Sequence, residues 1–364
     1  MPLVDLIAGA RPNFMKIAPI IDAFEERLGN GGRLEWRLVH TGQHYDRGLS
    51  GAFFEELGIP APDVNLGVGS GSQAEQTAAI MLRYERLLLE HPSDCCLVVG
   101  DVNSTMACAI AARKLGVAVA HVEGGLRSRD WSMPEEINRV VTDSITSWFF
   151  TTLPSANENL RREGVEADRI FFVGNTMIDT LLKHRNRFRP PGFWWELGLA
   201  PRGYLVLTLH RPANVDDPGK LEALLGAILK ASGGMPVIFP VHPRTRRSLV
   251  AMGMGLERLV CTEPLGYLEF NHLVEHALGV VTDSGGITEE ATVLGVPCIT
   301  LRENTERPET VTMGTNELAG TDPKNIPPLL SRMLAGQWKK GHIPPLWDGQ
   351  AARRITVELE RLLP

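Results

Sequence analysis

Short apolar runs rich in β-branched residues alternate along this chain with longer amphipathic stretches, and this alternation constrains the fold more than any other feature. In the first half we expect strands near residues 4–7, 38–41, 97–99, 117–122, 148–151 and 170–173. Amphipathic segments such as 73–89 and 105–115 lie between them, where we expect helices. Strands that alternate with helices form parallel sheets covered by those helices. The pattern therefore predicts an α/β protein.

A proline-containing stretch, residues 185–201, interrupts the alternation, and a second series of the same kind follows it. The expected strands of this second series lie near residues 204–209, 237–241, 259–262, 280–282 and 298–301. The length of 364 residues also fits two domains, at about 150 residues per domain. We therefore interpret residues 185–201 as the crossover between two α/β domains.

The charge balance and the cysteines limit the class of protein. Lys and Arg number 37 against 43 Asp and Glu, a formal charge of −6, whereas general nucleic-acid binders carry a basic excess. A small anionic ligand remains compatible with this balance. The first residues do not resemble a secretory signal, and no uncharged run approaches the roughly 18 apolar residues of a membrane span. Five scattered cysteines fit reduced thiols, so we expect a soluble cytoplasmic protein.

Unusual polar residues follow many of the expected strands directly. These strand-end segments are Ala10-Arg11-Pro12, Gly42-Gln43-His44, Gly100-Asp101, Glu123-Gly124-Gly125, His210-Arg211-Pro212, His242-Pro243-Arg244 and Asp283-Ser284-Gly285-Gly286. Ligands of open α/β sheets bind at the carboxyl ends of the strands, where helix N-termini present free N–H groups. Because each half carries such a row, we expect two sheets that face one another across a binding cleft.

Several common catalytic signatures are absent from the sequence. It contains no G-x-G-x-x-G after a strand, no G-x-x-x-x-G-K-[ST] and no G-x-S-x-G, so these patterns give no support to dinucleotide binding, P-loop phosphoryl transfer or a nucleophile elbow. Residues 272–276 match H-x-x-E-H, an inverted zinc-protease pattern. We interpret this match as chance on an amphipathic helix, and we predict no metal site.

Residues 283–290 form the best candidate anion site. Two glycines after an expected strand let the backbone approach a ligand closely, and the start of a helix suits a phosphate. Glu290 lies one turn into this helix, where its carboxylate can accept hydrogen bonds from sugar hydroxyls. The alternative is a plain capped turn with Ser284 as the N-cap. Further cations at strand ends favour a diphosphate site, since Arg forks match phosphate oxygens in pairs: Arg11, Lys16, Arg302 and Arg307.

Several acidic residues gather in the first half. Asp101 and Glu123 directly follow strands, and Glu135 and Glu136 form a pair further on. Carboxylates that share a cleft raise one another's pKa, which suits general acid and base catalysis. The alternative is ordinary salt bridges to Arg127, Arg129 or Arg139, and for Glu136 we prefer it. In the second half, His210 is placed to donate to a phosphate or a leaving oxygen.

Taken together, the sequence resembles the non-hydrolysing UDP-N-acetylglucosamine 2-epimerase family over nearly its whole length. The matching segments are residues 9–19 (GARPNFMKIAP), 41–44 (TGQH), 100–107 (GDVNSTMA), 121–128 (HVEGGLRS), 133–139 (MPEEINR), 174–179 (GNTMID), 209–217 (LHRPANVDD), 240–245 (PVHPRT), 282–291 (TDSGGITEEA) and 303–309 (ENTERPE). Many ordered motifs at consistent spacing make the resemblance specific.

The resemblance implies a fold of two Rossmann-like domains facing a cleft, as in the B-type glycosyltransferases, with the C-terminal helix returning to the first domain. We expect an N-terminal domain of residues 1–172 plus 350–364 on the sugar side, and a C-terminal domain of residues 173–349 on the UDP side. The resemblance also implies a homodimer that acts on a UDP-N-acetylhexosamine, needs no cofactor or metal, and serves cell-surface polysaccharide biosynthesis.

Site residues follow from the same resemblance at the matching positions. Those implied to hold the diphosphate are Arg11, Ser284, Gly285, Gly286 and Arg307. Glu290 is implied to bind the ribose, and Phe270 to lie beside the uracil. Those implied to surround the reacting sugar and its leaving phosphate are Lys16, Asp101, Glu123, Glu135 and His210.

The implied reaction explains these residue types. No carbonyl adjoins C2 of an N-acetylhexosamine, so its proton is not acidic. Breaking the C1–O bond toward UDP places positive character on C1, and a carboxylate then removes the C2 proton to give a 2-acetamidoglucal. Protonation from the other face and re-addition of UDP give the manno epimer. Two faces need at least two proton-handling groups, which we place among Asp101, Glu123 and Glu135 without assigning acid and base.

The sequence departs from the family pattern at three places. Only RDWS separates residues 121–128 from 133–136, where some bacterial members have a longer segment, and HVEGG replaces the commoner HVEAG. Some bacterial members are activated by a second substrate molecule, and the positions of that effector site match Gln43, His44, Arg211 and His242. The loop at residues 67–72 lacks the basic residue often found there, which argues against such activation.

Other functions remain open at this point. The nearest is the sister 2-epimerase of UDP-2,3-diacetamido-2,3-dideoxyglucuronate, although ERPE at 306–309 and KIAP at 16–19 favour the N-acetylglucosamine enzyme. A UDP-sugar glycosyltransferase or a silent UDP-sugar binder belongs to another class. The three carboxylates on the sugar side argue against a mere binder.

Overall fold

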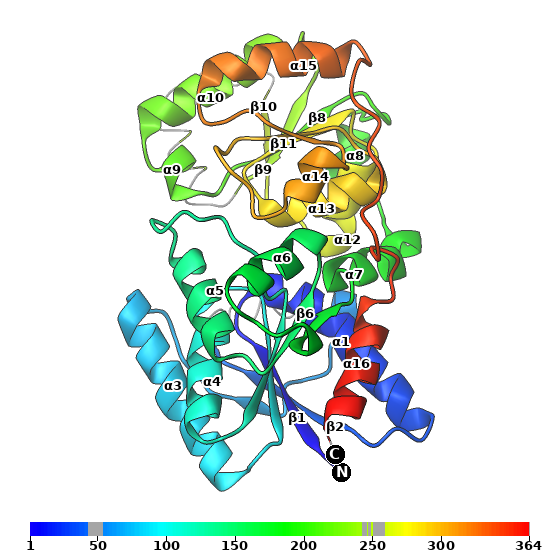
Figure 1. Ribbon diagram of the computed structural model, residues 1–364. Coiled ribbons are helices and arrows are strands. Elements are labelled where there is room, and N and C mark those ends of the chain that lie inside the picture. Colours follow the sequence, from blue (N-terminus) through cyan, green and yellow to red (C-terminus); the bar gives the residue numbers. More distant parts are fainter. Residues whose placement is uncertain (43–53, 242–245, 247–248, 250–258, 364) are drawn as a thin grey trace. The chain divides into compact units, whose positions relative to one another are not determined.

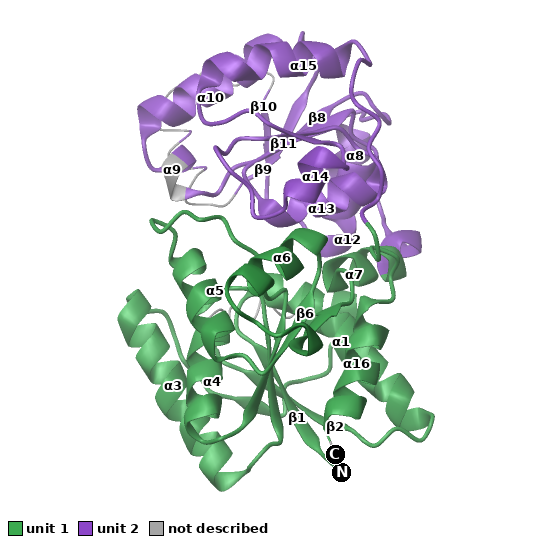
Figure 2. Ribbon diagram, in the orientation of Figure 1, with its two compact units in different colours: residues 1–183, 345–364 green, residues 184–344 purple. Residues whose placement is uncertain are grey.

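A computed structural model describes the chain except for residues 43–53, 242–245, 247–248, 250–258 and 364 and the side chains of Arg11, Pro212 and Ala213. The described chain divides into two compact units, residues 1–183 with 345–364 and residues 184–344 (Figure 2). Each unit contains one parallel sheet with helices packed on it (Figure 1). No helix among the described residues is both long and apolar enough to cross a bilayer.

The first unit contains a parallel sheet of seven described strands in the order β3-β2-β1-β4-β5-β6-β7. Its strands are β1 (Leu3–Ala8), β2 (Glu35–His40), β3 (Val64–Asn65), β4 (Cys95–Val99), β5 (Ala118–Val122), β6 (Trp148–Thr151) and β7 (Ile170–Phe172). The central strands are mainly apolar because helices cover both faces, and every residue of β4 is buried. The expected strands in this half are therefore confirmed, while the two-residue β3 was not expected.

The helices of the first unit follow the strands in turn. They are α1 (Arg11–Gly29), α3 (Gln73–Glu90), α4 (Asn103–Lys114), α5 (Pro134–Ile145), α6 (Pro154–Arg162), the 3-10 turn η1 (Ala167–Arg169), α7 (Thr176–His184) and α16 (Ala351–Leu362). A capping box begins α3: Ser72 accepts from Glu75 N at 3.3 Å, and Glu75 accepts from Ser72 N at 2.9 Å. Such local signals place the helix starts.

The C-terminal helix α16 belongs to the first unit. Asp179 on α7 accepts hydrogen bonds from Ala351 N and Ala352 N at 3.1 and 2.7 Å, so its carboxylate caps the start of α16. On α1, Glu26 pairs with Arg353 at 2.7 Å. Because α7 itself is tied to α1 through the Thr180 hydroxyl, the first unit runs on to residue 183 and begins again at residue 345. We expected the first domain to end at residue 172 and to resume at residue 350. The first unit instead ends at residue 183 and resumes at residue 345.

The second unit contains a parallel sheet of six described strands in the order β10-β9-β8-β11-β12-β13. Its strands are β8 (Leu205–Thr208), β9 (Val237–Pro240), β10 (Leu259–Thr262), β11 (Gly279–Thr282), β12 (Cys298–Thr300) and β13 (Asn316–Leu318). Its helices are η2 (Arg185–Arg187), α8 (Phe193–Glu196), α9 (Pro212–Val215), α10 (Pro218–Ala231), α12 (Tyr267–Glu275), α13 (Gly285–Leu294), α14 (Pro308–Thr312), η3 (Pro323–Asn325) and α15 (Ile326–Leu334). The stretch 185–201 holds η2 and α8, and β13 was not expected.

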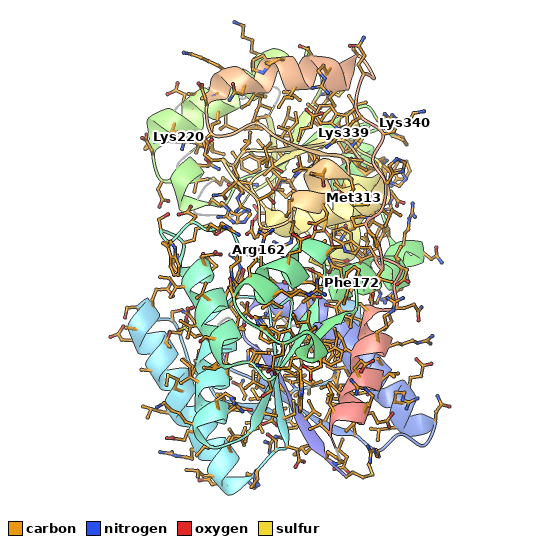
Figure 3. All side chains as sticks on the ribbon, viewed as in Figure 1. Arg162, Phe172, Lys220, Met313, Lys339 and Lys340 are labelled. Carbon is orange, nitrogen blue, oxygen red and sulfur yellow. The ribbon has the colours of Figure 1, made fainter. Side chains whose placement is uncertain are left out.

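The segment after α15 packs on the second unit before the chain returns to the first. Trp338 donates from its indole to the carbonyl of Thr315 at 2.7 Å. Lys339 is half-buried and donates to the carbonyl of Val311, whereas its neighbour Lys340 is exposed (Figure 3). These contacts explain why the second unit extends to residue 344.

Both sheets reverse their strand order once, between β1 and β4 in the first unit and between β8 and β11 in the second. At such a switch point the connections leave to opposite sides, and the opening at the carboxyl ends of the two strands is where α/β proteins bind ligands. The segments that follow these four strands are residues 9–11, 100–101, 209–211 and 283–285. They all belong to the strand-end segments that the sequence singles out.

Candidate active site

The first switch point is held in place by Asn13, in the first turn of α1. Its side-chain oxygen accepts from Gly9 N and Ala10 N at 3.3 and 3.0 Å, and its Nδ2 donates to the carbonyl of Val99 at 2.9 Å. One amide therefore joins the end of β1 to the end of β4. This contact fixes the turn that carries Arg11, whose own side chain is outside the described part of the structure.

A buried ion pair lies at this switch point. Lys16 Nζ is 2.6 Å from Glu123 Oε2, and the two side chains are only 8% and 3% exposed. Gly100 lies beneath the pair, since a Cβ at this residue would come within 3.3 Å of Lys16 Nζ, and its φ of +69° also favours glycine. Glu123 itself has a φ of +70°, a conformation that a non-glycine residue seldom adopts. The protein thus holds this carboxylate in an unusual backbone position.

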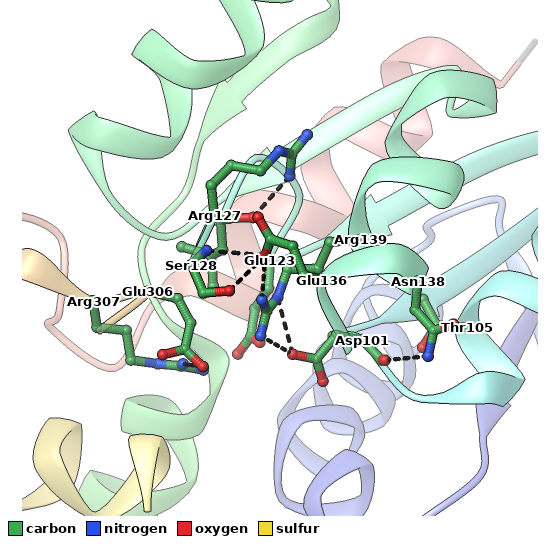
Figure 4. Close-up of polar contacts among 12 residues, drawn as sticks. Asp101, Thr105, Glu123, Arg127, Ser128, Glu136, Asn138, Arg139, Glu306 and Arg307 are labelled. Atoms are coloured by element: carbon green, nitrogen blue, oxygen red, sulfur yellow. Dashed lines mark hydrogen bonds and ion pairs between the residues drawn. The ribbon is translucent and has the colours of Figure 1, made fainter. Parts of the chain in front are cut away.

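Asp101 and Glu136 share one arginine. Arg139 donates from Nε and Nη2 to Asp101 Oδ2 at 3.0 and 2.6 Å, and from Nη1 to Glu136 Oε2 at 2.6 Å (Figure 4). The backbone N–H groups of Ser128 and Arg129 also donate to Glu136. Burial raises the pKa of Glu136, but these N–H donors and Arg139 outweigh it and lower the pKa below its ordinary value. The salt-bridge interpretation of Glu136 is confirmed.

Glu135 differs from its neighbour Glu136 although both lie in the first turn of α5. Glu135 is exposed and Glu136 is buried, because adjacent residues point to different faces of a helix. Of the three carboxylates expected to act on the sugar, the first unit therefore holds Asp101 and Glu123 in ion pairs and leaves Glu135 exposed at its surface.

In the second unit, Asp283 organises the switch point. Its buried carboxylate accepts from the backbone N–H groups of His210 and Arg211 at 3.1 and 3.0 Å, and it lies 2.9 Å from His210 Nδ1. Burial raises the pKa of Asp283, but the contact with His210 and the N–H donors lower it on balance. The side chain of His210 is 60% exposed, so its Nε2 is accessible while Nδ1 is fixed.

The N-terminus of α13 forms a cationic cradle. A Cβ at Gly285 would lie 3.0 Å from Arg307 Nη1 and 3.8 Å from Arg302 Nη1, so a larger residue there would press on the Arg307 guanidinium over the helix start. Gly286 follows in the same turn. Ser284 is the N-cap residue of α13, as the capped-turn alternative expects, although its side chain makes no capping hydrogen bond to any described residue. Phosphate binding at this helix start stays a prediction.

Two carboxylates hold the arginines of this cradle. Glu306 lies 2.8 Å from Arg302, 3.8 Å from Arg307 and 3.9 Å from Arg211, and Glu289 lies 2.7 Å from Arg307. Burial lowers the pKa of Arg302, although Glu306 acts in the opposite direction. The arginines are thus fixed before any ligand binds, and three guanidinium groups gather around Glu306.

Glu290 is buried on the same helix, with Asn271 as a hydrogen-bond donor at 3.5 Å. Burial raises the pKa of Glu290 to about 7, while hydrogen bonds from Tyr267 and Asn271 lower it in part. Phe270 lies on α12 and packs, half-buried, against the apolar core that includes Trp194. Both residues therefore lie in the second unit, with the α13 cradle.

Some expected residues cannot be placed. Gln43, His44 and His242, the proposed effector contacts besides Arg211, lie outside the described residues. The H-x-x-E-H residues lie on α12 and at its end, where the rings of His272 and His276 stack 4.2 Å apart against Trp194. Among the described residues, no three His, Cys, Asp or Glu side chains are grouped to hold a metal ion.

The sequence assigned no supporting role to Asn13 and Asp283, which hold segments that carry the candidate residues. Arg139 and Arg302 were named from the sequence, but the contact of Arg139 with Asp101 was not expected. A buried polar residue beside a strand end needs a partner, and this rule could have pointed to Asn13 and Asp283. The sequence alone does not tell which partner.

The chain is similar to known proteins over most of its length. The sequence model of the family described as "UDP-N-acetylglucosamine 2-epimerase" matches residues 26–360. The chain is 40% identical over 365 residues to the "UDP-N-acetylglucosamine 2-epimerase" of Methanocaldococcus jannaschii, with 97% of each chain covered. It is 39% identical over 360 residues to the "UDP-2,3-diacetamido-2,3-dideoxy-D-glucuronate 2-epimerase" of Pseudomonas aeruginosa, with 98% and 99% covered.

A solved structure matches over almost the whole chain. The Methanocaldococcus jannaschii UDP-GlcNAc 2-epimerase in complex with UDP-GlcNAc and UDP gives a TM-score of 0.88 at 40% identity, covering 99% of this chain and all of that one. The expected fold of two Rossmann-like domains of the glycosyltransferase-B type, with the C-terminal helix returning to the first, is thereby confirmed. The cleft expected between the domains stays a prediction. By sequence and by fold, the chain belongs to the UDP-N-acetylglucosamine 2-epimerase family.

Proposed function

We propose that this chain catalyses the reversible C2 epimerisation of UDP-N-acetylglucosamine to UDP-N-acetylmannosamine. The observation that carries the proposal is the buried Lys16–Glu123 pair at the switch point of the first unit. Burying a charged pair is costly, and a protein that only binds a nucleotide sugar has no use for a carboxylate held in this way. The printed names of the relatives support the same substrate class.

The second unit supplies the diphosphate side of the proposal. The start of α13, with Ser284, Gly285 and Gly286, presents backbone N–H groups, and Arg302 and Arg307 stand over it. We expect Arg11 of the first unit to add to this set. Fixed donors and cations aimed at a leaving group stabilise the charge that develops as its bond breaks. Glu290 would accept from the ribose hydroxyls, and Phe270 would lie by the uracil.

The proposed chemistry begins at C1. The C1–O bond breaks and its electron pair stays on the β-phosphate oxygen of UDP, which makes the C2 proton removable. A carboxylate takes that proton, and a C1=C2 double bond forms in 2-acetamidoglucal. A second group returns a proton to the opposite face of C2, and the UDP oxygen attacks C1 again. Atoms and charge balance with no external oxidant or reductant.

We place the proton-handling groups among Asp101, Glu123 and Glu135. Glu123 beside Lys16 and Asp101 beside Arg139 are both carboxylates with a fixed orientation. Glu135 is exposed and has freedom to reach a bound sugar. His210, oriented by Asp283 through Nδ1, would serve the leaving phosphate through Nε2.

The decisive experiment is incubation of the protein with UDP-N-acetylglucosamine in deuterated water, followed by NMR. Deuterium at C2 together with a manno product supports the proposal, and prolonged incubation should release UDP and 2-acetamidoglucal. Unchanged substrate, or a sugar transferred to an added acceptor, would refute it. A mock purification from cells that do not express the chain, carried out in parallel, excludes a contaminating enzyme.

A second candidate is the 2-epimerase of UDP-2,3-diacetamido-2,3-dideoxyglucuronate. The observation that favours it is the near-equal identity to the two named relatives, 40% and 39%. Its sugar carries a carboxylate and a further acetamido group, so the two substrates differ at C3 and C6. Measuring kcat/KM for both nucleotide sugars decides between them, and we expect the larger value for UDP-N-acetylglucosamine.

We further propose a homodimer formed by the first unit. A groove of about 440 Å³ runs across α3, α4 and α5 and is lined by apolar side chains that include Met81, Met106 and Ile137. Leu82 on α3 is 67% exposed beside it. Light scattering after size-exclusion chromatography should give a dimer mass, and Ile137→Lys should give a monomer. A wild-type monomer would refute this assembly.

The described cysteines, all unpaired thiols, fit the cytoplasm, where such an enzyme would supply a sugar nucleotide for cell-surface polysaccharide. Fractionation of cells with an antibody to the chain tests the location. Loss of a surface polysaccharide that contains N-acetylmannosamine, after deletion of the gene, tests the role.

A further inference from the structure

His121 is a fully buried histidine on β5, two residues before Glu123. Its Nδ1 lies 2.6 Å from Asp143 Oδ1, and its Nε2 lies 2.8 Å from the carbonyl oxygen of Gly100. A carbonyl oxygen can only accept a hydrogen bond, so Nε2 must carry a proton. What Nδ1 carries depends on the protonation of Asp143.

The other contacts of Asp143 establish that state. Its second oxygen, Oδ2, accepts from Gly125 N at 2.9 Å and lies 2.6 Å from Arg127 Nη1. Both of these partners are donors, so Oδ2 acts as an acceptor, and the positive charge of Arg127 at 2.6 Å favours Asp143 as a carboxylate. Burial raises the pKa of Asp143, but His121 and Arg127 outweigh burial and lower it. With a carboxylate on one side and a carbonyl on the other, both ring nitrogens of His121 donate.

The pair connects the two segments that carry the candidate acids. Gly100 immediately precedes Asp101, and Gly125 lies two residues after Glu123. Through His121, Asp143 holds the first segment, and through Gly125 N it holds the second. A Cβ at Gly124 would come within 3.4 Å of His121 Nδ1 and 3.3 Å of Asp143 Oδ1. Gly124, the first glycine of the HVEGG segment, therefore lets the turn lie directly on the His121–Asp143 pair.

We propose that His121 is a positioning residue of the epimerase, a buried imidazolium that holds the Gly100 carbonyl and thereby sets Asp101 relative to Glu123. This inference rests on the proposed function for its kinetic consequence, although the charge of the ring does not depend on it. A hydrogen bond from a charged donor is about twice as strong as a neutral one, which suits a joint that must stay rigid.

Charged groups lie on both sides of the His121 ring. Asp143 on α5 faces it directly, and Arg127 lies on the far side of Asp143. Beyond Gly100 lies the Lys16–Glu123 pair, which is neutral as a whole. Among the described residues, Asp143 is therefore the anion that contacts the His121 ring. The Gly100 peptide lies between the ring and Glu123.

Two substitutions separate the contacts of the ring. In His121→Gln the amide nitrogen replaces Nε2, which preserves a donor for Gly100 but removes the charge. In His121→Asn the amide nitrogen replaces Nδ1, which preserves the donor for Asp143 and loses the bond to Gly100. A displacement of catalytic groups by about 1 Å can cost about 100-fold in rate. We expect kcat to fall by about 100-fold in His121→Asn and by less in His121→Gln, with KM little changed.

The charge itself is tested by ¹⁵N NMR of the histidine rings at neutral pH, with and without substrate. His121 should show protons on both ring nitrogens. His40 provides an internal reference, since its Nδ1 accepts from Gly42 N and so carries no proton. The matched control variant is Glu163→Gln, which removes an exposed partner of Arg127 and should leave kcat and the His121 signals unchanged.

Different outcomes overturn different statements. An unprotonated ring nitrogen in His121 overturns the imidazolium, whatever the enzyme does. Wild-type kcat in a folded His121→Asn variant, with unfolding temperature within a few degrees of wild type, overturns the positioning role. An equal loss of kcat in both variants that tracks their loss of thermal stability means a merely structural role, which also overturns it. Absence of C2 exchange in the wild type refutes the proposed function and leaves the NMR result standing.

Discussion

Arg139 donates to Asp101 from two nitrogens, Nε and Nη2, at 3.0 and 2.6 Å, and uses its third nitrogen for Glu136. The guanidinium is 3% exposed and its partner Asp101 is 28% exposed, so the carboxylate reaches solvent while the arginine does not. Both nitrogens donate to the same oxygen, Oδ2, so the planar guanidinium fixes the position of that oxygen from two directions. Arg139 therefore holds one oxygen of Asp101 while part of the carboxylate reaches solvent.

The first prediction concerns this fork. Arg139→Lys keeps the charge but loses the paired geometry, so we expect kcat to fall by about 10- to 100-fold with a smaller change in KM. The measurement is steady-state epimerisation followed by NMR. The matched control is Arg332→Lys, which breaks a two-nitrogen contact with Glu317 at the surface of the second unit, where the Arg332 side chain is 45% exposed. That variant should keep wild-type kinetics, and an equal loss in both variants would contradict the prediction.

The second prediction concerns the Lys16–Glu123 pair. Removing one partner of a buried ion pair leaves the other charge uncompensated and costs about 3–5 kcal/mol. We therefore expect Lys16→Met to lower the free energy of unfolding by about that amount. Glu123→Gln keeps the shape and a hydrogen-bonding group, so it should be destabilised less and should lose C2 deuterium exchange. Urea unfolding and the exchange experiment test both statements.

Binding of UDP by Glu123→Gln shows whether Glu123 acts on the C2 proton or in nucleotide binding. If this residue handles the C2 proton, Glu123→Gln should still bind UDP, since the proposed diphosphate cradle lies in the second unit. Calorimetric titration with UDP provides the measurement. Retained exchange in Glu123→Gln would exclude Glu123 as the base and leave Asp101 and Glu135.

Much of this architecture follows from local sequence. Apolar runs predict the long strands because a strand buried on both faces admits few polar residues, and the polar residues after them mark the binding edge. Two short strands cannot be predicted in this way. Val64–Asn65 and Asn316–Leu318 are held as strands by pairing with β2 and β12, and a run of two or three residues carries no pattern of its own.

The side-chain partnerships were harder to foresee. The sequence names Arg139 as a partner for Glu136, but its bond to Asp101 depends on the neighbouring positions of β4 and β5, which sequence does not give. In the sequence, His121 lies within an apolar run that predicts a strand. Its partners Gly100 and Asp143 lie 21 and 22 residues away in the chain. Contacts of this kind depend on the tertiary fold, so local patterns do not contain them.

The third prediction concerns Gly285. Gly285→Ala places a methyl group 3.0 Å from Arg307 Nη1, and Glu289 holds that arginine at 2.7 Å. The cradle must then open or lose its close approach, so we expect UDP affinity to fall by at least about 10-fold, equivalent to about 1.4 kcal/mol. Calorimetric titration measures it.

A glycine elsewhere in the same unit provides the control for this substitution. Gly226 is an exposed residue inside α10, and a Cβ there meets no described atom within 4 Å. Gly226→Ala should leave UDP affinity unchanged and stabilise the protein by about 0.4–1 kcal/mol. An unchanged affinity in Gly285→Ala would show that the phosphate groups do not bind over the start of α13.

The fourth prediction is a pH dependence that arises from Glu290. Burial raises its pKa from 4.5 to about 7, so the carboxyl is largely protonated at pH 6 and ionised at pH 8. An ionised carboxylate accepts stronger hydrogen bonds from ribose hydroxyls than a neutral acid does. The affinity for UDP-N-acetylglucosamine, in which neither phosphate has a proton to lose in this range, should therefore rise between pH 6 and pH 8, and Glu290→Gln should remove most of this rise. A wild-type affinity that does not change with pH would contradict the ribose contact.

The same group makes stability depend on pH in the opposite direction. A carboxyl whose folded pKa is raised holds its proton in the folded state at pH values where the unfolded chain has lost it, so its contribution to stability is full below pH 4.5 and disappears as pH rises through 7. The shift corresponds to about 3 kcal/mol. Urea unfolding at pH 5 and pH 8 should show the wild type losing stability relative to Glu290→Gln. Glu222→Gln, an exposed change on α10, should show no such difference, and parallel curves for wild type and Glu290→Gln would mean that Glu290 is ionised throughout this range.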